Sequence, residues 1–570
     1  MSIPLRFDTP ARYICSSNHK TMKPLVLALT LSLHAAAGAK RQPIPTRGVP
    51  SGQYGGDEVA FANEAFEQFI LAQMDEWHVP GLSMAVIEGN KTWAKGFGYA
   101  TLGSEPATPS TLFYCGSMTK SVTAAALSLL IDEHKNGSNI QWTTPISSIL
   151  KDDFVLSDAW ATDHMTLEDA LCHRTGYPRH DFSGPFNSSV DMVRRFRHLP
   201  MSQEPRVKWQ YSNMMYGTLG YVVERTSATR LADFFRNRLW RPMGMLNTFL
   251  HPDDALASGG QLAHAYYYNN DTRQFGELPW NDEGSVAGAG MAISSVLDWS
   301  RYLRHMISES GPISAAGHAA LKAPHMVSEQ DRRIYSGTEF YGLGWGSNMM
   351  QNEAVWYHSG RVSGMLSYMA FVPARKFGFV VMLNTESVAA LDSIFSTTLF
   401  NYFEVVSSNR YDIRQGWYDL LRDLDDGLRN CSARLYPGVG GAALPPGMAL
   451  DDLVGSYYND GYGYANVTLR CDDWEAAHGS PSVLSLTSDG CRIVVPRAEL
   501  FGKNVSFQLQ HVAGDKWLAW YFVDDYKTVT RPAGCYRAQI VVGPDGKPDL
   551  LGMDMRMEGD DLPLTWFKRV

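Results

Sequence analysis

The sequence predicts an α+β domain whose sheet collects strands from both ends of one long segment, followed by an all-β sandwich or barrel. Three observations carry this prediction. Between residues 58 and 435, strand-like stretches lie at the two ends and helix-like stretches lie in the centre. Pro and Gly residues then cluster from Leu435 to Gly447, as in a linker. Beyond this cluster, short alternating apolar stretches are separated by turn residues, which is typical of all-β domains.

Local patterns place the elements in the first half of the α+β domain. Apolar residues over 61–78 have helical spacing and share one face. Two short strands are expected at 81–87 and 91–99, joined by a Gly-containing hairpin turn. A run of Ala and Leu predicts a strong helix over 116–134, which Asn136-Gly137 would end.

The second half of this domain begins helical and returns to strands. Residues 166–249 are expected to form helices and loops, with segments at 191–198 and 218–239. Apolar, β-rich stretches predict neighbouring strands, and a helix follows them. The strands are expected at 356–358, 366–372 and 378–383, the helix at 389–403, and the short strands of the second domain at 483–486, 506–509 and 517–522.

The composition is that of a globular protein with a large core. The chain has 570 residues, enough for two or three domains, with 45% hydrophobic and 19% charged residues. The net charge is −9, and no basic run predicts nucleic-acid binding. After the N-terminal region, no apolar segment is long enough to span a membrane. We therefore expect no nucleic-acid partner and no membrane span, and the oligomeric state stays open.

The N-terminus has the pattern of a secretory leader. A short apolar run over Leu25–Leu33 follows two lysines and leads into small residues. Ala37-Gly38-Ala39 is an A-x-A pattern that predicts cleavage before Lys40, and Met22 is an alternative start. The protein is therefore expected to be secreted to the extracellular space. The predicted organisation is a signal peptide at 1–39, a flexible leader at 40–57, the α+β domain at 58–435, a linker at 436–447 and the β-rich domain at 448–570.

Cysteines and sequons agree with export. Seven cysteines become six when Cys15 leaves with the leader, and an even number in an exported chain indicates disulfides. The pairing cannot be derived from sequence, but Cys471–Cys491, Cys115–Cys172 and Cys431–Cys535 are the favoured pairs. Seven N-x-S/T sequons are compatible with a glycoprotein surface: Asn90, Asn136, Asn187, Asn270, Asn430, Asn466 and Asn504.

The sharpest local feature is Gly116-Ser117-Met118-Thr119-Lys120 at the start of an expected helix. Residues three apart on a helix lie on nearly the same face, so Lys120 can reach the hydroxyl of Ser117. A serine hydroxyl needs a base to become a nucleophile, and a lysine serves only when burial or charge lowers its pKa. Taken alone, the pattern favours a Ser helix cap followed by a solvated Lys.

Two later motifs complete a recognisable set. Tyr211-Ser212-Asn213 stands in an expected loop, and His358-Ser359-Gly360 ends a β-rich stretch. In this order and spacing the three motifs resemble the serine β-lactamase and penicillin-binding-protein family. The closest branch resembles class C β-lactamases with their D,D-peptidase, D-aminopeptidase, transacylase and esterase relatives. Further stretches with family counterparts lie at 108–113, 171–176, 288–294 and 341–345, and the resemblance covers residues 58–400.

The resemblance implies a fold. It is the β-lactamase/transpeptidase-like fold, an antiparallel sheet flanked by a helical region. Residues 453–463 in turn resemble the opening of the small lipocalin-like barrel that follows some of these hydrolases. A C-terminal all-β, barrel-like domain is therefore expected.

The resemblance also implies roles for individual residues. Ser117 would be acylated, and Lys120 would remove its proton. Tyr211 would shuttle a proton to the leaving group and from the incoming water. Asn213 would orient Lys120 and the acyl amide of the substrate. The backbone N–H groups of Ser117 and Arg361 would form the oxyanion hole. A small-molecule acyl substrate is expected, with no cofactor and no metal.

One departure from the family concerns the third motif. Where β-lactamases carry Lys-Thr-Gly, this chain has His358, Ser359 and Gly360. The small Ser359 and Gly360 keep the strand edge open for substrate, and His358 replaces a fixed ammonium with a group that titrates near neutral pH. In the family, such a His is more typical of peptidase-like, aminopeptidase and esterase members. Our hypothesis is that Arg361 supplies the missing cation for a substrate carboxylate.

Other classes of hydrolase lack their motifs. There is no H-x-H-x-D-H cluster for a metallo-β-lactamase, so His173, His180 and Asp181 are interpreted as loop residues. There is no Gly-x-Ser-x-Gly for an α/β-hydrolase, and Gly288-x-Gly290 lacks the third Gly of a Rossmann site. The favoured function is a secreted serine hydrolase of ester, amide or β-lactam-like substrates. The alternatives are an acyltransferase of the same fold and a non-catalytic binding protein.

Overall fold

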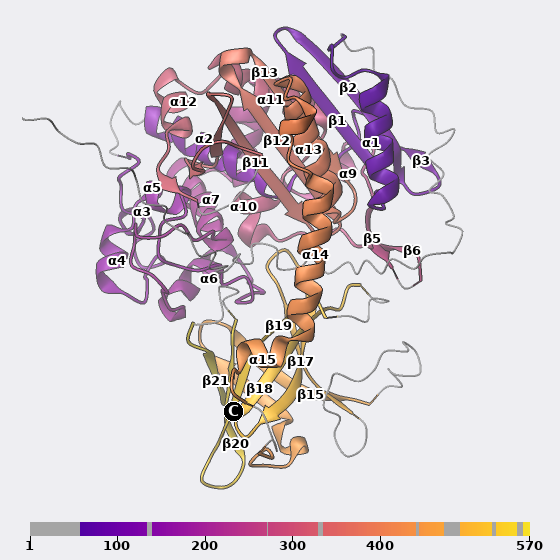
Figure 1. The fold of residues 1–570 in the computed structure, drawn as a ribbon. Helices are drawn as coiled ribbons and strands as arrows, with labels where there is room; N and C mark the ends of the chain where they lie inside the picture. Colours follow the sequence, from indigo (N-terminus) through magenta and orange to yellow (C-terminus); the bar gives the residue numbers. More distant parts are fainter. Residues whose placement is uncertain are drawn as a thin grey trace, which may run out of the picture.

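The computed structural model describes residues 58–133, 140–270, 272–328, 334–439, 444–471, 491–526, 532–555 and 562–570. In Figure 1 an α+β body lies above and a β-barrel lies below, and helix α14 runs from one to the other. The expected signal peptide, the flexible leader, the Asn136-Gly137 helix end and the strand at 483–486 lie outside the described residues.

The α+β body is organised around a nine-stranded antiparallel sheet. Its strand order is β3-β2-β1-β13-β12-β11-β10-β9-β8. The first strand, β1, pairs with β13, so that Leu82 lies opposite Leu383. The sheet therefore collects strands from both ends of the segment, and the predicted α+β fold is confirmed. The strands are β1 (Gly81–Glu88), β2 (Lys91–Thr101), β3 (Glu105–Pro106), β8 (Met326–Val327), β9 (Phe340–Tyr341), β10 (Gly346–Met350), β11 (Glu353–Val362), β12 (Met365–Val372) and β13 (Phe377–Leu383).

Two hydrophobic cores cover the two faces of the sheet. All eight residues of β12 are buried, and because strand side chains alternate between faces, they divide between the cores. Tyr368 packs with α1 and α13 in one core, whereas Met369 packs with the helical region in the other. Figure 1 shows α1 and α13 beside the sheet. The flanking helices are α1 (Glu64–Glu76), α11 (Val296–Ser308) and α13 (Val388–Tyr402).

The helical region lies between the two groups of strands in sequence. The expected helix over 116–134 begins as a 3-10 turn, η1 (Gly116–Met118), and continues as α2 (Thr119–Glu133). The expected segment over 218–239 contains the second part of α7 and all of α8, and the two are separated where α7 ends at Ser227 and Ala228 adopts a left-handed φ of 52°. Other elements of the region are α3 (Ile146–Leu150), α4 (Ala159–His164), α5 (Leu167–Leu171), α6 (Ser189–Arg195), α7 (Asn213–Ser227), α8 (Leu231–Phe234), α9 (Pro252–Ala257), α10 (Ala287–Gly290), α12 (Ala315–Lys322), and the strand pairs β4 (Phe113–Tyr114) with β7 (Ile293–Ser294) and β5 (Ala265–Asn269) with β6 (Gln274–Leu278).

The second domain is a closed eight-stranded barrel, which decides between the expected sandwich and barrel. Its first strand pairs with both the second and the last, so the barrel has no free edge. The helices α14 (Ile413–Arg429) and α15 (Cys431–Leu435) lead to it. The strands are β14 (Gly455–Asn459), β15 (Gly463–Arg470), β16 (Arg492–Ala498), β17 (Asn504–Ala513), β18 (Lys516–Val523), β19 (Gly534–Val542), β20 (Pro548–Met553) and β21 (Thr565–Arg569).

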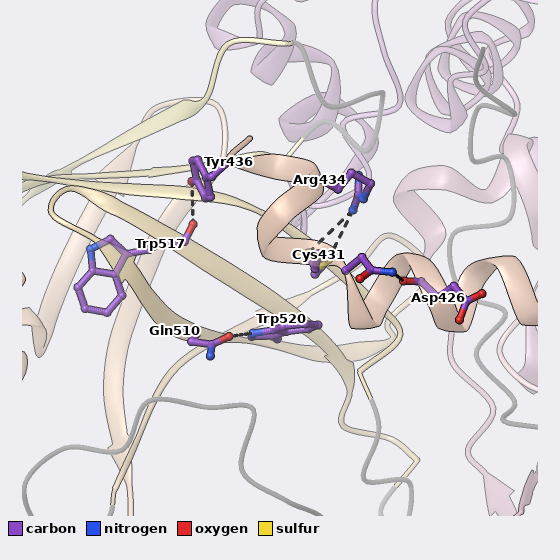
Figure 2. The surroundings of a disulfide bond; sticks show 9 residues. Asp426, Cys431, Arg434, Tyr436, Gln510, Trp517 and Trp520 are labelled. Atoms are coloured by element: carbon purple, nitrogen blue, oxygen red, sulfur yellow. Dashed lines mark hydrogen bonds between the residues drawn. A yellow bond between two sulfur atoms is a disulfide. The ribbon is translucent and has the colours of Figure 1, made fainter. Parts of the chain in front are cut away.

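Two of the three expected disulfides are present. Cys471 is bonded to Cys491 between neighbouring barrel strands, and Cys431 is bonded to Cys535, which ties α15 to β19 (Figure 2). The expected bond between Cys115 and Cys172 is wrong, because both thiols are free and buried. The sulfur of Cys115 instead accepts a hydrogen bond from the Trp299 indole at 3.0 Å. Within the described ranges, no helix is both long and apolar enough to cross a membrane.

Removing the bond between α15 and β19 is expected to destabilise the barrel. The Cys431→Ala/Cys535→Ala variant opens a loop with a sequence separation of 104 residues, and a cost of about 2–4 kcal/mol is expected from the entropy gained by the unfolded chain. The matched Cys471→Ala/Cys491→Ala variant opens a separation of only 20 residues, so its cost should be about 1.5 kcal/mol smaller. Denaturant unfolding measures both, and an equal or larger cost for the short loop would contradict this account.

Candidate active site

Ser117 lies in the 3-10 turn that precedes α2, and its side chain is half-buried. The preceding Gly116 has a φ of 52°, a left-handed conformation that favours glycine. A methyl group built on Gly116 would lie 2.3 Å from the backbone nitrogen of Arg361. The turn therefore presents Ser117 at the place where the chain passes against strand β11.

Lys120 is fully buried one helical turn after Ser117. Its Nζ lies 3.0 Å from Ser117 Oγ, 2.8 Å from Asn213 Oδ1 and 2.8 Å from the carbonyl oxygen of Ala289. The carboxamide and carbonyl oxygens can only accept hydrogen bonds, so they take two N–H groups. In a neutral amine this leaves the lone pair facing the hydroxyl of Ser117.

The environment of Lys120 favours that neutral amine. Burial holds the pKa of Lys120 well below its usual value, and the nearby Arg179 guanidinium lowers this pKa further, whereas Asp181 opposes the shift. The same three contacts also satisfy the ammonium form, in which the third N–H faces Ser117. The site therefore accommodates Lys120 with or without its proton.

Tyr211 provides the second contact to the Ser117 hydroxyl. Its hydroxyl donates to Ser117 Oγ at 2.7 Å. Burial raises the pKa of Tyr211, an effect that the hydrogen bond with Ser117 and the Arg179 charge only partly offset. Lys120 Nζ lies 4.7 Å from the centre of the ring, and Arg179 lies 5.1 Å from it. Tyr211 is therefore a phenol at neutral pH and holds a proton at the reacting oxygen.

Asn213 connects Lys120 to an ion pair. It is the first residue of α7, where the side chain of Ser212 caps the helix. Its Oδ1 accepts from Lys120, and its Nδ2 donates to Asp181 Oδ1 at 3.3 Å. Asp181 in turn binds Arg179 at 2.7 Å. The carboxamide orientation is thus fixed from both sides, which agrees with the expected orienting role.

His173 supports the backbone beneath Tyr211. Its Nδ1 accepts a hydrogen bond from the backbone N–H of Ser212 at 3.1 Å, and its ring lies 4.3 Å from that of Tyr211. Burial lowers the pKa of His173 well below its usual value, and Lys120 adds to this shift. A neutral imidazole that accepts at Nδ1 therefore holds the Tyr211-Ser212 backbone in place.

Strand β11 forms the opposite wall of the site. A methyl group built on Gly360 would lie 1.9 Å from the carbonyl oxygen of Cys115, so only glycine allows this close approach. Ser359 is half-buried beside it. His358 is buried, with its Nε2 2.8 Å from the hydroxyl of Tyr341 and its Nδ1 2.6 Å from the Ser359 carbonyl. Its ring is therefore engaged within the protein.

Replacing Gly360 by alanine is expected to lower kcat for an acyl substrate about 100-fold. The added methyl group must push β11 away from Cys115, which moves the Arg361 N–H relative to Ser117. The matched control is Gly427→Ala in α14, where an added methyl group meets nothing within 4 Å. Steady-state kinetics and melting curves of both variants measure the effect. Full activity of well-folded Gly360→Ala would contradict the close approach.

The side chain of Arg361 does not stand free as a cation. It forms a salt bridge with Glu386, whose side chain is buried. The Glu386 carboxylate raises the pKa of Arg361 against the opposing effect of burial. The positive charge that our hypothesis assigned to a substrate carboxylate is thus already paired inside the protein.

The structure brings together Ser117, Lys120, Tyr211 and Asn213 by direct hydrogen bonds and places Gly360 and Arg361 against the same turn. Sequence reasoning missed several neighbours: Asp181 and His173 were interpreted as plain loop residues, and Arg179, Glu386 and the Ala289 carbonyl received no role. Ala289 lies in one of the stretches with family counterparts, which was its only signal. Within the described ranges, no group of three or more His, Cys, Asp or Glu side chains is placed to hold a metal ion.

A serine paired with a buried lysine and a tyrosine, on an antiparallel sheet with a helical region, is the arrangement typical of a serine hydrolase. Comparison with known proteins agrees. The Beta-lactamase family model matches residues 66–393, more than half of the chain. The chain belongs to the Beta-lactamase family and is a hydrolase of that family.

Two curated relatives are fungal hydrolases. The unguisins hydrolase ungD' of Aspergillus campestris is 35% identical over 409 residues, which cover 70% of this chain and 76% of that protein. The unguisins hydrolase ungD of Aspergillus violaceofuscus is 30% identical over 536 residues, covering 89% of this chain and 90% of that protein. A solved structure, the octameric penicillin-binding protein homologue from Pyrococcus abyssi, has the same fold at 18% identity, with a TM-score of 0.55 over 88% of this chain and 99% of that one.

Proposed function

We propose that the protein hydrolyses amide or ester bonds through an acyl-enzyme at Ser117. The observation that carries this proposal is the pair of contacts at Ser117 Oγ, 3.0 Å from a buried lysine nitrogen and 2.7 Å from a tyrosine hydroxyl. A neutral lysine takes the serine proton, and a protonated tyrosine stands ready to give one. The low pKa of Lys120 and the high pKa of Tyr211 suit these opposite tasks.

In the first step the Ser117 oxygen attacks the substrate carbonyl carbon. The serine proton passes to Lys120 Nζ, and the negative charge that develops on the carbonyl oxygen is stabilised by the backbone N–H groups of Ser117 and Arg361. When the intermediate collapses, the bond to the leaving nitrogen or oxygen breaks. Tyr211 gives its proton to the leaving group and regains one from Lys120, which leaves an ester of Ser117.

In the second step water replaces the leaving group. As the water oxygen attacks the ester carbonyl, Tyr211 takes a proton from the water and passes its own proton to Lys120. Collapse of the intermediate returns a proton from this pair to Ser117 Oγ. The products are a carboxylic acid and the free enzyme. An alcohol or amine in place of water would give acyl transfer by the same route, since the acyl-enzyme is common to both reactions.

The two fungal relatives guide the choice of substrate. Both are named as hydrolases of unguisins, and the longer alignment covers 89% of this chain. This similarity favours unguisins as the first natural substrates to test. In addition, the chain carries His358 in place of the β-lactamase lysine. The His358 ring is hydrogen-bonded to the Tyr341 hydroxyl and the Ser359 carbonyl. A β-lactam is therefore expected to react less well than a peptide-like amide or an activated ester.

The proposal is tested by following the acyl-enzyme directly. The purified protein is incubated with p-nitrophenyl butyrate, a fluorescent penicillin or an unguisin, and intact mass and product formation are recorded. We expect a transient mass gain that peptide mapping locates on Ser117, and turnover of the ester and the unguisin. Products recorded with and without added ethanol separate hydrolysis from acyl transfer. Turnover without any adduct on Ser117 would overturn the proposal.

We also propose that the protein is secreted. The leader pattern that ends at Ala39, the two disulfides and the exposed positions of several sequons, among them Asn90 and Asn187, support this proposal. N-terminal sequencing of protein from the culture medium is expected to begin at Lys40. Glycosidase treatment is expected to lower its mass. Retention of the whole pool inside the cell would contradict secretion.

A further inference from the structure

The turn between barrel strands β16 and β17, residues 499–503, reaches into the α+β body beside the candidate active site. The backbone N–H of Leu500 donates to the carbonyl oxygen of Asp181 at 2.9 Å. The side chain of Asn281 donates to the carbonyl oxygens of Phe501 and Gly502 at 3.5 and 3.3 Å. Two segments of the α+β body thus form hydrogen bonds with this turn, which is here called the barrel turn.

The barrel turn lies directly against the wall that holds Lys120. A methyl group built on Gly290 would lie 2.8 Å from the Phe501 ring and 3.7 Å from the Gly116 carbonyl carbon. The neighbouring Ala289 provides the carbonyl oxygen that accepts from Lys120. The barrel turn and the 3-10 turn that contains Ser117 therefore both pack against Gly290.

Lys503 connects the barrel turn to a buried carboxylate of the α+β body. Its Nζ lies 3.0 Å from Glu386 Oε1, and both side chains are buried. The same carboxylate binds the Arg361 guanidinium and accepts the backbone N–H of Gly364 at 3.1 Å. Arg361 and Lys503 together hold the pKa of Glu386 well below its usual range, despite its burial. The Glu386 carboxylate thus connects Lys503 of the barrel to Arg361 near the end of β11 and to Gly364 in the turn before β12.

We propose that Lys503 is a positioning residue for the acyl-enzyme reaction, because through Glu386 it fixes the Arg361–Gly364 segment whose Arg361 N–H would bind the oxyanion. This inference rests on the proposed function. An oxyanion donor works only when it is held within a few tenths of an ångström of its place. Loss of Lys503 removes one of the two cations described above as partners of Glu386, so the carboxylate that contacts both Arg361 and Gly364 is held less firmly.

The test compares Lys503→Met with Lys503→Arg in the full-length protein. Active-site titration with a fluorescent phosphonate gives the concentration of competent Ser117, and kcat for p-nitrophenyl butyrate is expressed per titrated site. We expect Lys503→Met to lower this kcat about 10–100-fold with less than about a threefold change in KM. Lys503→Arg should recover most of the loss. The control is Lys516→Met, an exposed barrel lysine paired with Asp515.

A kcat per titrated site within twofold of the wild type in Lys503→Met overturns the proposal, since a purely structural role lowers only the number of competent sites. If Lys503→Met gives no titratable protein, Asn281→Ala decides, because it removes only the side-chain contacts with Phe501 and Gly502. We then expect a several-fold lower kcat, and an unchanged value overturns the proposal. A wild-type protein whose Ser117 takes no label overturns the proposed function and this inference together.

Discussion

Replacing Ser117 by alanine is expected to lower kcat/KM for an activated ester by about 10⁴-fold or more. The alanine removes the hydroxyl that contacts both Lys120 and Tyr211, at 3.0 and 2.7 Å, so no acyl-enzyme forms. The residual rate would come from binding and oxyanion stabilisation alone. The loss is expected with little change in melting temperature, because the Ser117 side chain is half-buried and small.

The matched control is Ser110→Ala. Ser110 is an exposed serine seven residues before Ser117. It should keep the full rate. Initial rates with p-nitrophenyl butyrate and with an unguisin measure both variants. If Ser117→Ala keeps more than a tenth of the wild-type rate, the nucleophile is another group, and the mechanism proposed above fails.

Replacing Lys120 by methionine is expected to lower kcat about 10³–10⁴-fold. Methionine keeps the length and the burial of the side chain but cannot take the Ser117 proton. It also leaves Asn213 Oδ1 and the Ala289 carbonyl without their donor. Lys516→Met is again the control, since the side chain of this barrel lysine is 43% exposed and forms an ion pair with Asp515. A kcat within tenfold of the wild type would exclude Lys120 as the base.

The pH profile of the wild type should carry the signature of Lys120. Because burial places its pKa well below the usual lysine value, the acylation rate should rise as pH passes through this lowered pKa and then level off. Between that pKa and the unfolded-state value near 10.4, the unfolded chain binds more protons, so stability rises with pH. Stopped-flow acylation and denaturant unfolding across this range measure both trends. In Lys120→Met, the acylation rate should no longer rise with pH through this pKa. The free energy of unfolding should depend less on pH.

Much of the fold was predictable because its signals are local. Continuous apolar, β-rich stretches marked β12 and β13, and the Ala- and Leu-rich run marked α2, so element types followed from residue patterns. The break after Ser227 was not predictable, because Ala228 in a left-handed conformation gives no sequence signal. The pattern therefore indicated helices and loops over 218–239 without the residue at which α7 ends.

The same contrast holds at the site. Ser117 and Lys120 are three residues apart, so helix geometry alone predicted their contact. Glu386 and Lys503 are separated by 117 residues and lie in different domains, so no local pattern could pair them. The wrong Cys115–Cys172 pair has the same origin. Each thiol is buried in its own surroundings, and an even count of cysteines carries no geometry.

The pairing of β1 with β13 has a consequence for the order in which the enzyme becomes active. These strands lie about 300 residues apart in the chain, and closing the sheet between them is a late, non-local event in folding. Ser117 follows the first strands, whereas Gly360 and Arg361 lie on a strand that is made long afterwards. During synthesis, a chain that ends before β11 already carries the serine but lacks the wall opposite it. The complete site, with Ser117 beside Gly360 and Arg361, thus forms only when the sheet closes.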